Sequence, residues 1–264
     1  MIKNIDHFDI RQIADSGQCF RWKVMSDTEV KIVALDRTLT VKKLSEGFSF
    51  DCTEEEFERF YAHYFDLETD YFKIESIIMA SEDTHLKKCF EMGRGIRILN
   101  QDLFEMLVSF MISQNNNIPR IKGSIEAIAK KGGFTTLNDE NEFRLPKPGE
   151  ISPDFFMDKS LGLGYRDAYL KELYEFLEKE PEWPEYLKTL SYEGAKKELL
   201  KKKGIGPKVA DCVSLFGLHH IDAFPIDTHV KQLLEKYYSQ GFDYDTYKGF
   251  LGIVQQYLFY AELK

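Results

Sequence analysis

The spacing of the hydrophobic residues changes at Thr53, and this change limits the folds that the chain can adopt. Between Val30 and Cys52, apolar and polar residues alternate in short stretches, a period typical of antiparallel strands. From Thr53 onward, apolar residues recur every three or four positions, as on one face of a helix. We therefore expect an α+β fold, with a small N-terminal antiparallel β-sheet domain followed by a mostly α-helical body.

Several helix boundaries can be located from local signals. Thr-Glu-Glu-Glu at 53–56 has the pattern of a capping box. A pair of glycines, Gly132 and Gly133, should end a helix that begins near Ile118. We place a domain boundary at residue 98, with a mixed α/β domain over 1–98 and an all-α region over 99–264. Apolar residues at helical spacing predict helices over 103–111, 118–128, 170–177 and 230–237, with a long connection over 133–161.

Composition excludes several classes of protein. The 264 residues, 43% of them hydrophobic, can bury a core without disulfides or structural metals. No apolar run reaches the roughly 18 residues of a membrane-spanning helix, and the first ten residues lack the apolar core of a secretion signal. The four cysteines are scattered, which favours reduced thiols and no metal site. We expect a cytoplasmic protein without membrane contact, associated with the nucleoid if the source is prokaryotic.

The charge is acidic overall but uneven. The formal net charge of −9 argues against a nucleic-acid partner when it is taken over the whole chain. Residues 51–75, however, hold nine acidic and two basic residues, whereas residues 196–208 hold six lysines and one glutamate. The distribution therefore permits a locally positive surface on an acidic body.

The lysine-rich stretch is interrupted by Gly204-Ile205-Gly206-Pro207. Two glycines allow a tight turn, and proline suits the first position of a new helix, so we expect a helix-hairpin-helix unit. Free N–H groups at the start of the second helix could hold a phosphate, with Lys203 and its neighbours beside them. A plain helical hairpin explains the glycines equally well.

Lys208 and Asp227 are candidate chemical groups. Lys208 falls in the first turn of the second helix, where the helix dipole disfavours the ammonium form and favours a nucleophilic amine. Asp227 stands at the N-cap position of the helix predicted over 230–237, and a carboxylate fixed there could stabilise a developing positive charge. The alternatives are a phosphate-contacting lysine and a purely structural cap.

These segments resemble the helix-hairpin-helix (HhH-GPD) DNA glycosylases, and in particular the 8-oxoguanine DNA glycosylase/AP lyases of the eukaryotic type. The lysine of the hairpin segment and the aspartate of Pro-Ile-Asp-Thr-His are nineteen positions apart. The other matching segments are S-G-Q-C-F-R-W at 16–22, S-F-M-I-S-Q-N-N-N-I-P-R-I at 109–121, L-G-L-G-Y-R at 161–166, and the C-terminal Q-Q-Y-L-F-Y-A-E-L. They run in order over nearly the whole chain.

The resemblance implies a role for each matching residue. Lys208 would attack the deoxyribose C1′ and form a Schiff base, and Asp227 would stabilise the positive charge on the sugar. The carbonyl of Gly17 would accept the N7–H that distinguishes 8-oxoguanine from guanine. The other implied base-binding residues are Cys212, Phe216, Pro225, Gln255 and Phe259. The implied DNA-binding residues are Asn115, Arg120, Tyr165, Arg166, Lys203, Gly204, Gly206 and His229.

One residue departs from the pattern. Phe216 stands where the better-known eukaryotic members carry a methionine, and this phenylalanine could tighten the floor of the base pocket.

Two features distinguish the chain from other glycosylases that it resembles. It has no cysteine quartet near the C-terminus, which argues against the iron–sulfur relatives, and it has Lys208, which argues against the monofunctional relatives.

Three functions remain open from the sequence. The first is a bifunctional 8-oxoguanine glycosylase/lyase that acts as a monomer on double-stranded DNA, needs no cofactor and could hold a structural cation at Gly204–Gly206. The second is a lysine-dependent glycosylase with another lesion or opposite base, which Gly17, Gln255 and Phe259 would distinguish from the first. The third is a non-catalytic DNA-binding protein, which the pair Lys208 and Asp227 disfavours.

Overall fold

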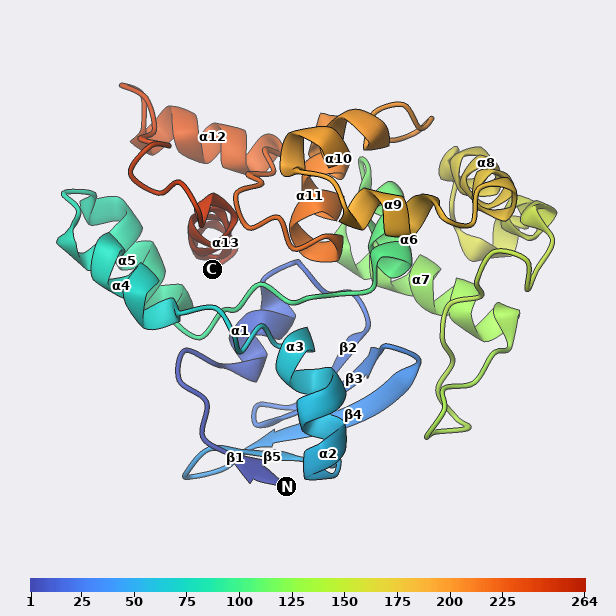
Figure 1. The fold of residues 1–264 in the computed structure, drawn as a ribbon, viewed down its shortest axis with the longest axis horizontal. Coiled ribbons are helices and arrows are strands. Elements are labelled where there is room, and N and C mark those ends of the chain that lie inside the picture. Colours follow the sequence, from blue (N-terminus) through green and yellow to red (C-terminus); the bar gives the residue numbers. More distant parts are fainter.

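The computed structural model describes all residues from 1 to 264 and places a five-stranded antiparallel sheet at the N-terminus (Figure 1). The strand order is β1-β5-β4-β3-β2. This confirms the predicted α+β fold. The strands are β1 (Ile2–Lys3), β2 (Trp22–Ser26), β3 (Glu29–Ala34), β4 (Arg37–Lys43) and β5 (Phe48–Phe50).

The sheet is larger than the alternating stretch that starts at Val30, because two strands lie before it. In β2 only Trp22 is buried and the remaining residues are partly or fully exposed, so the strand carries no alternating apolar signal. β2 is held in the sheet by antiparallel pairing with β3, in which Trp22 lies opposite Ile32. The two-residue β1 is too short for any periodic signal.

One face of the sheet is covered by α1 (Ile10–Asp15) and by a helical segment that begins at the predicted capping box. Thr53 Oγ1 accepts a hydrogen bond from the Glu56 N–H at 3.2 Å, and the Glu56 carboxylate accepts one from the Thr53 N–H at 3.1 Å, which confirms the box. The segment comprises α2 (Glu54–Glu56), a π-helical stretch over Phe57–Tyr61, and α3 (Ala62–Tyr64). Phe57, buried beside β5, belongs to the small core of 18 residues beneath the sheet.

The rest of the chain is helical. The predicted helices over 103–111, 118–128, 170–177 and 230–237 are confirmed, each as part of a longer helix. The second of these, α7 (Ile118–Gly132), ends at Gly133, which has a left-handed φ of 76°. None of the helices combines the length and the apolar character needed to span a bilayer. The bounds are α4 (Tyr71–Ala80), α5 (Thr84–Gly93), α6 (Leu103–Ser113), α7 (Ile118–Gly132), α8 (Arg166–Lys179), α9 (Trp183–Lys188), α10 (Tyr192–Leu199), α11 (Pro207–Gly217), α12 (Thr228–Tyr237) and α13 (Leu251–Glu262), with short 3-10 turns at Pro153–Met157 and Lys159–Leu161.

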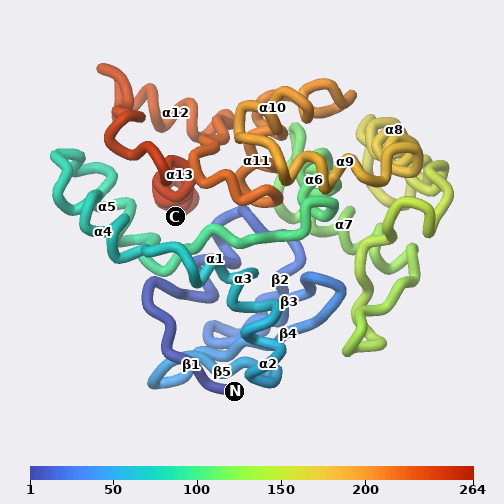
Figure 2. Tube along the Cα trace, in the orientation of Figure 1, coloured from blue at the N-terminus to red at the C-terminus, as the bar shows by residue number.

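A second core of 49 residues holds the helices together. This core includes Ile74 and Ile78 of α4 and Leu86 and Phe90 of α5. The C-terminal helix α13 contacts both α5 and α12, two helices far apart in the sequence (Figure 2). Helices α4 and α5 precede residue 98 yet belong to the large core. The division of the chain at residue 98 stays a prediction.

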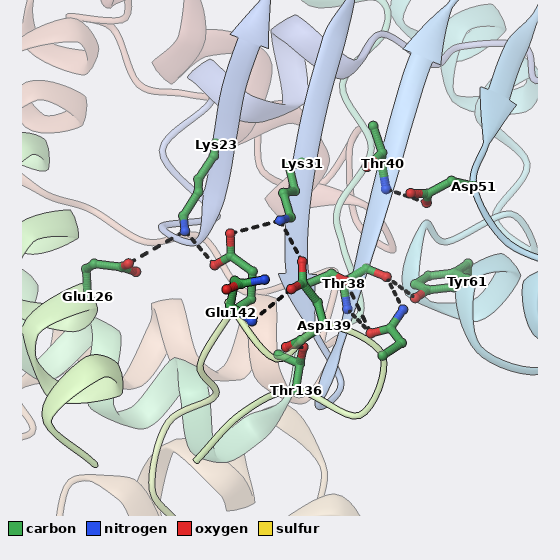
Figure 3. Close-up of polar contacts among 12 residues, drawn as sticks. Lys23, Lys31, Thr38, Thr40, Asp51, Tyr61, Glu126, Thr136, Asp139 and Glu142 are labelled. Carbon is green, nitrogen blue, oxygen red and sulfur yellow. Dashed lines mark hydrogen bonds and ion pairs between the residues drawn. The ribbon is translucent and has the colours of Figure 1, made fainter. Parts of the chain in front are cut away.

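The long connection after α7 fastens the helical body to the sheet (Figure 3). Lys31 of β3 lies 2.8 Å from an Asp139 oxygen and 3.1 Å from a Glu142 oxygen, and Lys23 of β2 lies 2.6 Å from Glu142. The carboxamide oxygen of Asn138 accepts a hydrogen bond from the Thr38 N–H of β4 at 2.8 Å. Lys23 also lies 3.5 Å from Glu126 of α7, so these contacts fix β2, β3 and β4 relative to α7 and the connection that follows it.

Candidate active site

A cleft with a volume of about 1180 Å³ opens where the loop before β2 meets the ends of α6, α11, α12 and α13. Its charged side chains are two lysines, Lys208 and Lys231, and one carboxylate, Asp227. The cleft therefore carries few acidic groups although the chain is acidic overall. The predicted site residues that line it are Gly17, Asn115, Tyr165, Gly206, Lys208, Asp227, His229 and Phe259.

Lys208 lies in the first turn of α11, which begins at Pro207 as predicted. Its Nζ is 3.4 Å from the Ser113 hydroxyl oxygen and 5.2 Å from the centroid of the Phe110 ring, both of α6. No carboxylate lies within ion-pair distance of this amine. The Cys212 thiol is a further hydrogen-bonding neighbour of this amine. An amine whose neighbours are a hydroxyl, a thiol and an aromatic face, with no carboxylate among them, keeps its nitrogen available for chemistry in the cleft.

Asp227 is the N-cap of α12, as expected. Its Oδ1 accepts a hydrogen bond from the Val230 N–H at 2.9 Å, while its backbone is extended. Pro225, two residues earlier, is buried and restricts the backbone that leads to the cap. The carboxylate is therefore held rigidly at the cleft wall, opposite in charge to the lysines.

Gly17 and Phe259 contact each other at another wall of the cleft. Gly17 has a left-handed φ of 78°, and a Cβ built on it would lie 3.0 Å from Cε1 of Phe259. The Gly17 carbonyl accepts no hydrogen bond from the backbone. The close approach of ring and backbone thus requires glycine, and it leaves an acceptor unoccupied.

Four predicted base-binding residues lie behind the cleft surface and are buried: Cys212, Phe216, Pro225 and Gln255. Burial raises the pKa of the Cys212 thiol to about 11, so this side chain is neutral. The Phe216 ring stacks on Phe110 with centroids 5.5 Å apart, beneath the Lys208 amine. The Gln255 amide donates to the Pro225 carbonyl at 3.2 Å. Their contact with a base stays a prediction.

The three asparagines form the turn between α6 and α7. Asn115 has a left-handed φ of 45°, and Asn117 caps α7 by accepting a hydrogen bond from the Arg120 N–H at 3.0 Å. Arg120 and Tyr165 are exposed. Arg166, by contrast, is buried and donates from Nη2 to the Asn115 carbonyl at 3.0 Å, so the structure uses it to hold the turn.

The helix-hairpin-helix unit is present. Its first helix, α10, ends at Leu199, so Lys201, Lys202 and Lys203 lie in the turn that leads to Gly204 and not in the helix. The backbone N–H groups of Gly206, Lys208 and Val209 donate no hydrogen bond within the backbone. These groups point from the start of an eleven-residue helix, an arrangement suited to an anion.

Each of the three lysines directly before the hairpin has a partner within the protein, and their contact with DNA stays a prediction. Lys201 pairs with Glu198 at 2.6 Å, Lys202 lies 3.2 Å from the centroid of the Phe176 ring, and Lys203 pairs with Glu172. The positive charge of the run is therefore partly neutralised, and a contact between Lys203 and DNA would compete with Glu172.

Two glutamines hold the site together in the structure, although the sequence pattern indicates no role for either. Gln18, next to Gly17, is fully buried and its amide contacts Ser16, Arg97 and Leu99 at 2.9 Å each. Gln114 joins the asparagine turn to the hairpin, with its Nε2 2.8 Å from the Gly204 carbonyl oxygen. Their positions inside matching segments were the only available signal, since sequence does not distinguish a buried glutamine from an exposed one.

Comparison with known proteins agrees with this fold. A family model described as 8-oxoguanine DNA glycosylase, N-terminal domain, matches residues 1–107. The N-glycosylase/DNA lyase OGG1 of Arabidopsis thaliana is 35% identical over 152 residues, which are 54% of this chain and 41% of that protein. A probable N-glycosylase/DNA lyase of Methanothermobacter thermautotrophicus is 32% identical over 192 residues, 64% of this chain and 60% of that protein. The matches thus span about half the length of these curated relatives.

The solved structures cover more of the chain. The Clostridium acetobutylicum 8-oxoguanine glycosylase/lyase, in complex with double-stranded DNA containing cytosine opposite 8-oxoguanine, is 33% identical with a TM-score of 0.89. That similarity covers 99% of this chain and 97% of the other. A 3-methyladenine DNA glycosylase from Archaeoglobus fulgidus, 17% identical with a TM-score of 0.75, shares the fold. The chain therefore belongs to the 8-oxoguanine DNA glycosylase/lyase family of the helix-hairpin-helix superfamily.

Proposed function

We propose that this protein removes 8-oxoguanine from double-stranded DNA, preferably opposite cytosine, and then cleaves the strand at the abasic site. The observation that carries the proposal is the pairing, in one cleft, of the Lys208 amine without a carboxylate partner and the helix-capping carboxylate of Asp227. The relative from Clostridium acetobutylicum, similar over nearly the whole chain, was solved with DNA of this kind.

The chemistry requires Lys208 as a neutral amine. Its nitrogen attacks C1′ of the sugar while the bond from C1′ to the base breaks, and the base departs with the bonding electrons and a proton from the amine. Opening of the sugar ring moves the C1′–O4′ electrons onto O4′, which takes a proton, and leaves a Schiff base between C1′ and Nζ. Loss of a C2′ proton then expels the 3′ phosphate by β-elimination, and water releases the lysine.

Asp227 acts on the charge that develops during the first step. As the base departs, positive charge accumulates on C1′ and O4′, and a fixed carboxylate at the same wall stabilises it without needing to reorient. The cap to Val230 uses Oδ1, so Oδ2 faces no donor of the protein and remains available to the sugar or to a proton in transfer.

The base must leave the duplex to reach this amine. We propose that the free Gly17 carbonyl accepts the N7–H of 8-oxoguanine, where guanine would present a lone pair against an acceptor. Phe259, in contact with Gly17, would stack on one face of the base, and the neutral Cys212 would contact the other. Gln255 would read the remaining edge after exchanging its contact with the Pro225 carbonyl, and Phe216 would support the floor.

The DNA backbone would bind at the hairpin, where the N–H groups of Gly206 and Val209 are free, with Lys203 and His229 nearby. We propose that Asn115 fills the gap left by the base, that Tyr165 wedges into the duplex, and that Arg120 and Arg166 contact the opposite cytosine. Arg166 would have to release part of its bonding to the asparagine turn.

The proposed reaction needs an amine and a carboxylate and no cofactor, and we propose that a monomer performs it in the cytoplasm, or at the nucleoid in a prokaryote. A cation at Gly204–Gly206 stays a prediction. The Gly204 carbonyl already accepts a hydrogen bond from Gln114 and the Gly206 carbonyl one from Ala210, so each has one lone pair left for such an ion.

Borohydride trapping tests the proposal. The protein is incubated with duplexes that carry 8-oxoguanine opposite each of the four bases, and the reduced protein–DNA adduct is separated on a denaturing gel. We expect most adduct opposite cytosine and none with Lys208→Gln. Lys231→Gln removes the other lysine of the same cleft and is the matched control that should still be trapped.

The binding of Lys208→Gln separates chemistry from recognition. This variant should still bind the lesion duplex, and its affinity should fall steeply as the salt concentration rises, because phosphate contacts dominate the binding. Equal adduct with Lys208→Gln would refute the assigned nucleophile, and an adduct only with a different oxidised base would favour the second function left open by the sequence.

A further inference from the structure

Gln114 connects the two loops that the proposed function assigns to the DNA. Its side-chain Nε2 donates to the Gly204 carbonyl of the hairpin at 2.8 Å and to the Met111 carbonyl of α6 at 3.0 Å. The Met111 contact alone would be an ordinary way to satisfy a carbonyl at the end of a helix. The Gly204 contact joins residues 90 positions apart in the sequence. One amide thus ties the end of α6 to the phosphate-binding hairpin.

The backbone of Gln114 is anchored from the opposite side. Arg166 donates from Nε to the Gln114 carbonyl at 2.9 Å and from Nη2 to the Asn115 carbonyl at 3.0 Å. Arg166 also donates from Nη1 to the Leu163 carbonyl at 3.0 Å, which locks its own orientation. The peptide groups on both sides of the Asn115 Cα are therefore constrained, and the φ of 45° at Asn115 aims its side chain in one direction.

The hairpin is held against the same unit. A Cβ on Gly204 would lie 2.6 Å from the Tyr169 ring, so hairpin and ring are in direct contact. Tyr169 packs edge to face on Tyr165, with ring centroids 5.8 Å apart. The hairpin, the asparagine turn and the start of α8 consequently form a closed ring of contacts, in which the Gln114 amide is the hydrogen bond between hairpin and turn.

We propose that Gln114 is a positioning residue that couples the hairpin to the asparagine turn, so that a DNA backbone held at Gly204–Gly206 is placed in register with the Asn115 side chain. This inference rests on the proposed function, in which Asn115 fills the gap in the duplex. Gln114 itself acts through Asn115 and needs no contact with the lesion.

The test compares two duplexes that differ only in the presence of a gap. One contains a tetrahydrofuran abasic-site analogue opposite cytosine, and the other is undamaged. Gln114→Met keeps the length of the side chain but removes the amide donor, and we expect it to lower the preference for the abasic duplex by about three- to tenfold, the usual range for one net hydrogen bond. Binding to the undamaged duplex should change less than twofold, since the hairpin N–H groups remain.

Two further variants control this comparison. Gln114→Glu also lacks the donor. Its added negative charge should weaken binding to both duplexes alike, so the ratio of the two affinities should again fall because the hydrogen bond is lost. This variant replaces Gln114→Met if Gln114→Met does not fold. Asn100→Leu removes a comparable amide-to-carbonyl bond, to His63 at 2.7 Å, outside the cleft. It should leave the ratio as in the wild type.

A double-mutant cycle distinguishes positioning from a general structural role. If Gln114 acts through Asn115, Gln114→Met should have no further effect on the ratio in an Asn115→Ala background. An equal decrease in both backgrounds, or an unchanged ratio in both Gln114 variants, would overturn the inference while leaving the proposed function intact. A wild-type protein that binds the two duplexes equally well would overturn both.

Discussion

Replacing Gly17 with alanine should damage the site in two separable ways. The first is backbone strain, because a non-glycine residue at a φ of 78° costs about 1–2 kcal/mol. The second is displacement of the Phe259 ring, because the new methyl group would lie 3.0 Å from Cε1, whereas carbon atoms in favourable contact are about 3.5–4.0 Å apart. The ring must therefore move by roughly 0.5 Å.

These two effects should be visible in different assays. Backbone strain should lower the melting temperature by about 2–4 °C for each kcal/mol in a chain of this size. Movement of the ring should slow single-turnover excision of 8-oxoguanine by about tenfold, since misplacement of a reacting group by about 1 Å can cost about a hundredfold.

Gly133→Ala is the matched control. Its φ of 76° is almost identical, but no atom lies within 4 Å of the added Cβ, and the residue is at the far end of α7. Both variants should therefore lose similar stability, and only Gly17→Ala should lose activity. Equal excision rates in the two variants would refute the argument that Gly17 shapes the pocket through Phe259.

The remaining predictions concern buried or capping groups. Asp227→Asn should keep the cap to Val230 and the melting temperature but slow excision by about a hundredfold or more, whereas Asp227→Ala should also lose about 1 kcal/mol of stability; equal activity of Asp227→Asn and wild type would remove Asp227 from the chemistry. Gln18→Leu should destabilise by about 1–3 kcal/mol in denaturant titrations, because the Leu99 N–H loses its partner in the core, and an unchanged midpoint would contradict this. Burial raises the pKa of the Glu105 carboxyl from 4.5 to about 7, so the folded state binds this proton more tightly than the unfolded chain and its stabilising contribution is lost as the pH rises through this interval. Glu105→Gln should flatten the pH dependence of unfolding between those values, and an identical slope would show that another group titrates.

Local signals predicted the helical framework correctly. The capping box at Thr53, the left-handed glycine at Gly133, the proline that starts α11 and the cap at Asp227 all lie where the sequence placed them. Each of these depends on hydrogen bonds or backbone angles within about four residues, and so the residue types themselves carry the information. Strand β2 has no such local signal, because its place in the sheet is set by hydrogen bonding to β3.

The sequence indicated which residues line the candidate site, but not which partners inside the protein hold them. The matching segments carried Lys208, Asp227, Gly17 and Phe259, which line one cleft in the structure. The partner of Lys203 could not be predicted, because Glu172 lies on α8, 31 positions away in the sequence. The same holds for Arg166, whose burial under the asparagine turn depends on how α8 packs.

By itself the sequence determined the fold class, the hairpin, and the lysine and aspartate available for chemistry, because periodicity, caps and turns are encoded by neighbouring residues. Only the tertiary structure decided which side chains are held in place and by what. Gln18 contacts Leu99 and Gln114 contacts Gly204, across 81 and 90 positions. Whether a glutamine supports a site or faces solvent depends on such long-range contacts, which form only when helices and sheet pack around a common core.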